Sequence, residues 1–533
     1  MKKRIDTVYS GASFHTLRLE DESFQYLGVT GGKISYLSNI RPDSGDYKRE
    51  VKLDGLHVFP SFTDAHLHLL YSVVLAVSGF DICEIRNGGV TPNTLKGVGE
   101  RLRSYCDGRS LSDLIVANSY IASAIDEKRL PSRLELDDWT GGRRSIIYSI
   151  DGHSSSLSTS MLSTLGIDPE GHNGVLSGAD HEFQQGRVTD IVGASIGLRD
   201  ISRGVADFVN QCASFGITRV CAMDGNGDTP NDRMTKLLST IARRMDIDVY
   251  LYPQYMKLDR ARPFWKKSRR PRIGGCGDWE IDGAVGSHSA AFYDSYSDTG
   301  QIAECYYTQD ETDEAVRRAD AEGCQIAIHA IGDAAIDRAL EAFEKLGSET
   351  LHRIEHFEFP TDEAVSRLIA HGKIALSVQP GFAWIDARYL KSYESYLPQA
   401  IAARQVPLKR LYDAGVALCA SSDSPIQTLD PFVQLVGMVD FSVPGQSLSN
   451  YEALRCYTAN PARVLGQDMC SGTLESGKDA SFFATDTDLT AVGIDALSSA
   501  KVVHTFIRGK KLGGRKGTLS EFLLMMLRRA RKI

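Results

Sequence analysis

The feature that most restricts the fold of this chain is an alternation of short β-rich runs with helical patterns, from about residue 56 to 465. This alternation is typical of parallel α/β folds, because a helix must return the chain before the next parallel strand begins. The helical pattern is clear in DAAIDRALEAFEKL, where apolar residues recur at i, i+3, i+4 and i+7 and predict one buried face; they are Ile336, Ala339, Leu340 and Phe343.

The β-rich runs are slightly too numerous for one closed (β/α)8 barrel, which needs eight strands. Nine candidates begin at Leu56, Ser145, Ile217, Ile247, Asp278, Gln325, His352, Lys373 and Val416. A tenth, LIVANSY, begins at Leu114 and indicates an insertion at about 69–144. We therefore predict an α/β protein with a (β/α)8 TIM barrel over residues 56–467, interrupted by this insertion.

The two ends of the chain differ from the middle. Residues 1–55 and 468–515 contain short strand-like runs with glycine turns, such as LGVTGGKISYL and SGKDASFFATD. They predict a small composite β-sandwich domain built from both termini. Residues 516–533 end in SEFLLMMLRRARKI, which predicts a docked C-terminal helix.

Composition excludes several classes of function. The 533 residues carry 60 Lys+Arg against 68 Asp+Glu, a net charge of −8, which argues against nucleic-acid binding. No run approaches the roughly 18 apolar residues of a membrane span, and no apolar segment follows MKKRIDTVYS. We expect a cytoplasmic protein with a small-molecule substrate, and a homo-oligomer is compatible with the sequence.

The ten cysteines form no C-x-x-C pair, so we interpret them as reduced, mostly buried thiols rather than as disulfides or a thiolate zinc site. They are Cys83, Cys106, Cys212, Cys221, Cys276, Cys305, Cys324, Cys419, Cys456 and Cys470.

Two histidines lie one residue apart at the end of the run VFPSFTDAHLHLL. Side chains at i and i+2 of a strand point to the same face, so His66 and His68 are predicted to converge on one metal ion. Three further candidate ligands follow later strands: His329 in QIAIHAIGD, His356 in HRIEHFEFP and Asp423 in CASSDSPI.

In a parallel barrel these strand ends open on one face, so distant residues can surround one site. Singly, each histidine is more often a hydrogen-bonded loop residue, and Asp423 could cap a turn. Together, imidazole and carboxylate ligands suit Zn²⁺, Fe²⁺ or Mn²⁺, and such an ion activates water near neutral pH. The set predicts metal-assisted hydrolysis.

These motifs resemble a known family. FPSFTDAHLHL is similar to the opening motif of the amidohydrolase superfamily, and HAIGDAAIDRAL, RIEHFEF, SSDSPI and IDGAVGSHSAAFYDSYSDTG are similar to later motifs of its YtcJ-like, amidohydrolase-3 branch. The resemblance implies hydrolysis of amide-like C–N bonds with one or two divalent metals, zinc foremost. By position it implies that His66 and His68 bind the first metal, that His329 and His356 bind the second, and that Asp423 binds metal and shuttles the proton.

Two departures from the family pattern affect the site. Where relatives often carry a carboxylated lysine that bridges two metals, this chain has Asp278. In an extended strand Asp278 and Glu280 would share a face, so either could bridge, or neither does and the site holds one metal. The family's arginine in G-S-R-T is replaced by His288, a substrate-binding candidate.

Other readings stay open. His153 in SIDGHSSS could hold or polarise a substrate carbonyl, or lie in a capped turn. GASIG would make Ser195 a serine nucleophile, but the flanking strand and helix that such a site needs are not evident. The basic run at 257–272 is a solvated loop, a contact for an acidic substrate or a subunit contact. The alternatives to hydrolysis of an amide-like bond are a mononuclear deaminase of the same superfamily and a non-catalytic regulatory or binding relative.

Overall fold

The computed structural model describes residues 4–86, 89–225, 233–266 and 268–531. Two all-parallel sheets lie at its centre. One has the order β17-β16-β8, with β8 at Phe62–Leu67, β16 at Ile217–Asp224 and β17 at Asp248–Pro253. The other runs from β18 to β22 in sequence order: β18 (Arg272–Gly274), β19 (Gln325–Ala330), β20 (His352–His356), β21 (Ile374–Val378) and β22 (Leu418–Ala420).

The two sheets contact each other at both of their edges. A parallel bridge pairs Leu67 at the end of β8 with Ser424 after β22, and β17 contacts β18. The mixed α/β class is confirmed, whereas closure of the eight strands into a barrel stays a prediction.

Helices separate these strands. In α10 (Asp333–Glu344) the predicted apolar face is confirmed, because Ile336, Ala339, Leu340 and Phe343 are all buried. The other helices of this part are α1 (Leu69–Ser78), α5 (Ala179–Ala194), α6 (Leu198–Ser214), α7 (Arg233–Ala242), α8 (Leu258–Trp265), α9 (Gln309–Ala321), α11 (Asp362–His371), α12 (Pro380–Ile385), α13 (Ser392–Tyr396), α14 (Gln399–Ala402), α15 (Leu408–Asp413), α16 (Pro431–Val439), α17 (Asn450–Tyr457) and α18 (Ala459–Val464). A further helix, α19 (Ile494–Ser499), lies between two strands near the C-terminal end of the chain.

A separate five-stranded sheet, of order β15-β14-β13-β12-β9, shows that the insertion is longer than predicted. Its strands are β9 (Gly79–Asp81), β12 (Ile115–Tyr120), β13 (Ser145–Ser149), β14 (Ser154–Leu157) and β15 (Val175–Ser177), with α2 (Leu95–Cys106), α3 (Arg133–Thr140) and α4 (Thr159–Leu165) between them. The run at Ser145 therefore pairs inside the insertion and is not a strand of the central sheets. The predicted end of the insertion at 144 is wrong, because the same sheet continues to Ser177.

The predicted strand at Asp278 is also wrong. Residues Gly277–Trp279 form a short 3-10 helix, η2, and the strand of this region is the three-residue β18 just before it.

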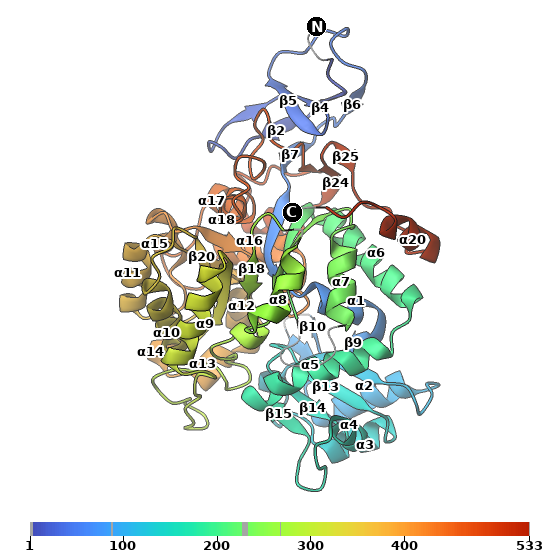
Figure 1. Ribbon diagram of the computed structural model, residues 1–533, viewed down its shortest axis with the longest axis vertical. Coiled ribbons are helices and arrows are strands. Elements are labelled where there is room, and N and C mark those ends of the chain that lie inside the picture. Colours follow the sequence, from blue (N-terminus) through green and yellow to red (C-terminus); the bar gives the residue numbers. More distant parts are fainter. Residues whose placement is uncertain (1–3, 87–88, 226–232, 267, 532–533) are drawn as a thin grey trace.

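Strands from both ends of the chain share one six-stranded sheet of order β25-β24-β23-β7-β2-β3. These are β2 (Ser13–His15), β3 (Ser23–Phe24), β7 (His57–Pro60), β23 (Phe482–Thr485), β24 (Val502–Ile507) and β25 (Lys510–Lys511). A second sheet, β5-β4-β1-β6, contains β1 (Thr7–Ser10), β4 (Tyr26–Thr30), β5 (Lys33–Ser38) and β6 (Glu50–Lys52). Figure 1 shows these strands at one end of the molecule and the insertion at the opposite end.

The C-terminal helix, α20 (Leu519–Met526), is shorter than the predicted segment 516–533. It is docked by Phe522 and Met525, both buried. None of the described helices has the length and apolar character that crossing a bilayer requires.

Candidate metal centre

The five strand-end residues predicted as metal ligands lie together. His66 is the second-last residue of β8, and His68 directly follows that strand. His329 is the second-last residue of β19, His356 is the last residue of β20, and Asp423 follows β22. The Asp423 Oδ1 atom is 3.3 Å from His66 Nε2 and 3.2 Å from His68 Nε2. The His356 ring centroid is 5.1 Å from that of His66 and 4.4 Å from that of His329.

Each of the four histidines uses its other ring nitrogen for a hydrogen bond to an oxygen that can only accept. The ring must therefore carry its proton on that side, which leaves the lone pair of the second nitrogen directed at the cluster. The four bonds run from His66 Nδ1 to Glu355 Oε2 (2.7 Å), from His68 Nδ1 to the Met223 carbonyl (3.0 Å), from His329 Nε2 to the Gly283 carbonyl (3.2 Å) and from His356 Nδ1 to Gln379 Oε1 (2.9 Å).

A buried ion pair supports the first of these bonds. Glu355 accepts from Arg353 Nε and from one of its terminal nitrogens, both at 2.8 Å, and all three side chains of the Arg353–Glu355–His66 series are buried. Burial raises the pKa of Glu355, but the charge of Arg353 and the bond to His66 outweigh it and hold the pKa below its usual value. The carboxylate thus stays ionised and keeps His66 in one orientation.

The loops that carry His356 and Asp423 have unusual backbones. His356 has φ 70° and Asp423 has φ 57°, a left-handed region that costs non-glycine residues about 1–3 kcal/mol. The Asp423 amide donates to the His66 carbonyl (2.9 Å), and Asp64 Oδ1 accepts from the Ser422 amide (3.1 Å). These bonds tie the loop after β22 to β8 and hold the strained residues in place.

The donor atoms fit a divalent metal ion. His356 Nε2 and Asp423 Oδ1 are buried and have no hydrogen-bond partner of good geometry, although Asp423 Oδ1 is close to two imidazole nitrogens. Nitrogen and oxygen ligands of a tetrahedral zinc ion, at bond lengths of about 2.0–2.2 Å, lie about 3.4 Å apart. The observed separations of 3.2 and 3.3 Å agree with that arrangement better than with hydrogen bonds.

Cys276 also lies in this cluster, and sequence reasoning missed it. Its Sγ atom is 3.5 Å from His66 Nε2 and 3.9 Å from His329 Nδ1. The interpretation of the ten cysteines as reduced, mostly buried thiols is confirmed, since all ten are free and eight are buried, but it did not foresee the place of Cys276 in this cluster. The signal available in the sequence was Gly274-Gly275-Cys276-Gly277, a cysteine between glycines directly after a short strand.

The two carboxylates predicted to bridge the metals lie elsewhere. Because η2 replaces the expected extended strand, Asp278 and Glu280 do not share a strand face. Asp278 accepts from the Met256 amide (3.0 Å) and lines the cavity, whereas Glu280 groups with His153 and Glu182. Among the described residues, neither belongs to a group of closely spaced donors that includes His66, His68, His329 or His356.

His153 faces the cluster from the insertion. Its Nδ1 is 3.0 Å from Glu182 Oε1 on α5, and its ring centroid is 5.1 Å from that of His329. Burial lowers the pKa of His153, but the bond to Glu182 and the charges of Glu182 and Glu280 dominate and raise it to about 10. Burial and the Glu182 charge raise the pKa of Glu280 well above its usual value. His153 is therefore a charged donor beside the candidate ligands.

Two other candidates lie away from the cluster. His288 Nε2 is 2.8 Å from Asp298 Oδ2, and the ring packs against Tyr296 and Tyr396 outside the cavity lining, so its predicted substrate contact is not supported. Ser195 follows the end of α5 and donates to the Val192 carbonyl (2.6 Å), which rules out the strand–turn–helix of a nucleophile elbow.

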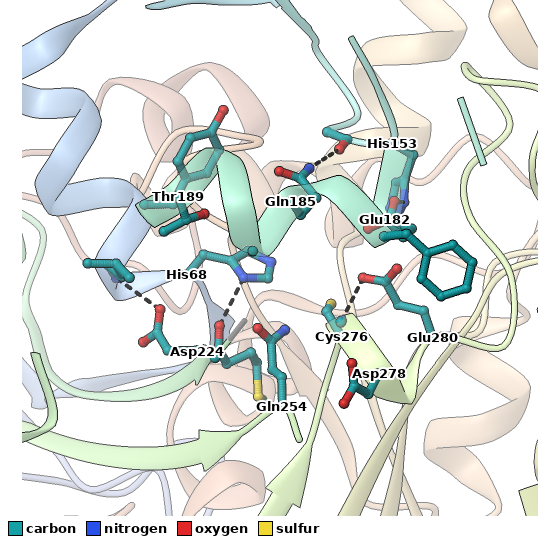
Figure 2. A pocket seen from close by; sticks show the side chains of 18 of the residues that line it. His68, His153, Glu182, Gln185, Thr189, Asp224, Gln254, Cys276, Asp278 and Glu280 are labelled. Atoms are coloured by element: carbon teal, nitrogen blue, oxygen red, sulfur yellow. Dashed lines mark hydrogen bonds and ion pairs between the residues drawn. The ribbon is translucent and has the colours of Figure 1, made fainter. Parts of the chain in front are cut away.

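A cavity of about 710 Å³ opens beside the cluster. In Figure 2 His68, Cys276 and Glu280 point into it, and Glu182, Gln185 and Thr189 reach it from α5. Its apolar lining comes mainly from α1, the insertion, α5 and the loop after β22: Val74, Leu75, Val116, Tyr148, Val192 and Ile426. Of the described part of the basic run 257–272, Lys257 lines this cavity, and Lys267 lies outside the described residues.

A sequence model of the amidohydrolase family matches residues 49–512, nearly the whole chain. The chain belongs to the amidohydrolase family. The prediction of an amidohydrolase that acts on C–N bonds is thereby confirmed, and so is the resemblance to the YtcJ-like branch.

Individual relatives support the assignment. N-substituted formamide deformylase of Arthrobacter pascens is 23% identical over 96% of this chain and 98% of its own length. Putative amidohydrolase YtcJ of Bacillus subtilis (strain 168) is 22% identical over 94% and 98%. The crystal structure of an uncharacterized metal-dependent hydrolase from Pyrococcus furiosus, 24% identical, superposes with a TM-score of 0.66 over 91% of this chain and 100% of that protein, and shows a shared fold.

Proposed function

We propose that this amidohydrolase hydrolyses the amide bond of a small N-formyl or N-acyl amine, or of a cyclic amide, with one or two divalent metal ions. The observation that carries the proposal is the set of convergent imidazole and carboxylate donors on one wall of a 710 Å³ cavity. Zinc suits these donors best, and iron or manganese are the alternatives. The deformylase name of the Arthrobacter relative supports a formyl or short acyl group.

The ligands in this proposal are His66 and His68 for one ion, His329 and His356 for a second, and Asp423. A divalent ion supplies Lewis acidity, which lowers the pKa of water and polarises a carbonyl oxygen. We assign the proton transfer to Asp423, which lines the cavity beside His66 and His68. Its carboxylate takes the proton of the attacking water and then delivers it to the leaving nitrogen, so that the acid and the free amine are formed together.

His153 is assigned to the substrate carbonyl. Glu182 holds its Nδ1, and the ring lies between that carboxylate and His329 at the cavity wall. A charged imidazolium there can donate a hydrogen bond to an oxygen that gains negative charge during the reaction.

The apolar part of the lining selects the other end of the substrate. Aliphatic and tyrosine side chains from α1, the insertion and α5 face the donors across the cavity. Because burial of apolar surface stabilises binding by about 25 cal/mol per Å², an apolar substituent on the amine nitrogen is favoured. We also propose that the eight central strands close into a (β/α)8 barrel, whose C-terminal face would then carry all the ligands.

The test is a panel of N-formyl, N-acyl, carbamate and cyclic amides assayed for amine release with added Zn²⁺ or Mn²⁺. His66→Ala and His68→Ala should abolish release and lower bound metal, while His371→Ala, at the end of α11, serves as a matched control and should retain both. Release of ammonia from amino-heterocycles in place of amines from amides would favour the deaminase. Full turnover in metal-depleted His66→Ala protein would overturn the proposal.

A further inference from the structure

Two of the donor groups in the candidate metal centre overlap at a single residue. His66, His68 and Cys276 form one group, and Cys276, His329 and His356 form another, with all ligand atoms of each group within 4.8 Å of one another. Among the described residues, Cys276 is the one side chain that these two groups share. It stands at the junction of the two metal positions in the proposed function.

The distances suit coordination. A tetrahedral zinc ion with a sulfur ligand at about 2.3 Å and a nitrogen ligand at about 2.0–2.1 Å separates the two ligand atoms by about 3.6 Å. The Cys276 sulfur is 3.5 Å from His66 Nε2 and 3.9 Å from His329 Nδ1. Both of these nitrogens face the cluster with their lone pairs, because the other nitrogen of each ring donates elsewhere. A thiol among such lone pairs has room for metal ions between itself and both rings.

The two residues before Cys276 are glycines, which lets the backbone lie very close to the neighbouring strands. Gly274 and Gly275 have φ of 98° and 105°, conformations that other residues rarely adopt. A Cβ atom on Gly274 would lie 2.0 Å from the Ala327 carbonyl oxygen, and one on Gly275 would lie 2.4 Å from Met223 Sδ. The two glycines therefore lie in close contact with β19 and β16, and Cys276, which follows them, lies beside His66 and His329.

The charge of two neighbouring metal ions also favours Cys276 as a ligand. Two divalent ions held about 3.5–4 Å apart repel each other and need an anionic group between them. Asp278 and Glu280 lie outside the overlapping groups, and imidazoles carry no negative charge. The Asp423 carboxylate groups with His66 and His356, but the proposed function assigns it to proton transfer. We propose that Cys276 is a metal ligand whose thiolate is shared by the two ions, in the bridging role that the family resemblance gives to a lysine.

This inference rests on the proposed function for the presence of a divalent metal centre. On binding, the S–H bond breaks, the sulfur forms its bonds to metal, and the proton leaves to solvent. A soft thiolate also favours zinc over manganese at this centre.

The test is loading of the purified protein with Co²⁺, followed by absorption spectroscopy and metal analysis. A thiolate ligand gives an intense near-ultraviolet sulfur-to-cobalt charge-transfer band, which nitrogen and oxygen ligands do not. We expect this band and about two ions per chain in the native protein. In Cys276→Ser the band should be lost and the metal content should fall towards one. Cys419→Ser, a buried cysteine of β22 outside the ligand groups, should keep both.

A second variant separates the charge from the sulfur. Cys276→Asp keeps an anionic group, so it should retain more metal than Cys276→Ser while lacking the band, and it serves if the serine variant does not fold. A native cobalt protein without the band, or a band that persists in Cys276→Ser, would overturn the inference. If Cys276→Ser keeps two ions and His66→Ala loses them, the result would support the metal centre and refute the shared thiolate. A native protein that binds no metal would overturn both proposals.

Discussion

Glu355→Gln is the substitution that most directly tests how the centre is supported. Glu355 is fully buried, accepts from His66 Nδ1 at 2.7 Å and pairs with buried Arg353 through two bonds of 2.8 Å. The amide would leave the Arg353 charge uncompensated, which typically costs about 3–5 kcal/mol in a buried pair. It would also weaken the acceptor that orients His66, a change that typically lowers metal affinity about 10–100-fold.

Both effects can be measured on one preparation. Urea unfolding of the metal-free protein gives the free energy of unfolding, and competition with a chelator gives the metal affinity. The matched control is Glu344→Gln, because Glu344 also forms two bonds to an arginine, Arg367, but is about one-third exposed. This control should cost less than about 1 kcal/mol and leave metal affinity unchanged. If Glu355→Gln kept metal affinity within twofold of the native value, the orienting role of Glu355 would be refuted.

Three further predictions concern the reaction and the effect of pH. Asp423→Asn should lower kcat at least about 100-fold with amide substrates, because an amide cannot carry the proton, and near-normal kcat would leave Asp423 a turn residue only. His153→Gln should lower kcat/KM about 10–1000-fold without changing bound metal, measured by turnover and metal analysis, and a parallel loss of metal would show instead that His153 is structural. His352 is buried, accepts from the Ile326 amide (3.2 Å) and has a pKa lowered to about 4, chiefly by burial. In the unfolded chain the pKa of His352 is higher, about 6.5. The contribution of His352 to the free energy of unfolding is therefore complete above that pH and is lost as the pH falls towards 4, by up to about 3 kcal/mol. Urea midpoints between pH 7.5 and 4.5 should show a fall that His352→Gln flattens, and equal slopes for the two proteins would refute this assignment.

Much of the cluster was visible in the sequence because its residues follow strands with strong patterns. The runs before His66 and His329 contain apolar and β-branched residues, Ile354 lies in the run before His356, and the ends of parallel strands meet on one face. Their convergence could therefore be inferred without knowing any loop conformation. Their role as metal ligands stays a proposal.

The rest depended on local geometry that no periodic pattern encodes. β18 has only three residues, so the sequence pattern predicts a strand at the acidic run DWEID and offers Asp278 or Glu280, but not Cys276, as the bridging residue. A positive φ at Gly274 and Gly275 decides where Cys276 points, and a single sequence does not show it. In the same way, the loop around His288 sends that ring to Asp298 rather than to the cavity.

The insertion was misjudged for a different reason. β13 is as apolar as a central strand, and what separates it from one is its pairing with β12 and β14. Strand partners are a long-range property, so a run of the right composition can join either sheet.

The continuity of β7 with β8 has a consequence for the order of events during synthesis. β7 is hydrogen-bonded to β2 on one side and to β23 on the other, and after Ser61 the chain passes directly into β8 and its two histidines. During translation β7 and β8 emerge early, but β23 leaves the ribosome only when most of the chain has been made. Until then β7 has an unpaired edge, and the segment that positions His66 and His68 is anchored on one side only. We therefore expect truncated nascent chains to capture metal poorly, and the native centre to mature after the last strands have docked.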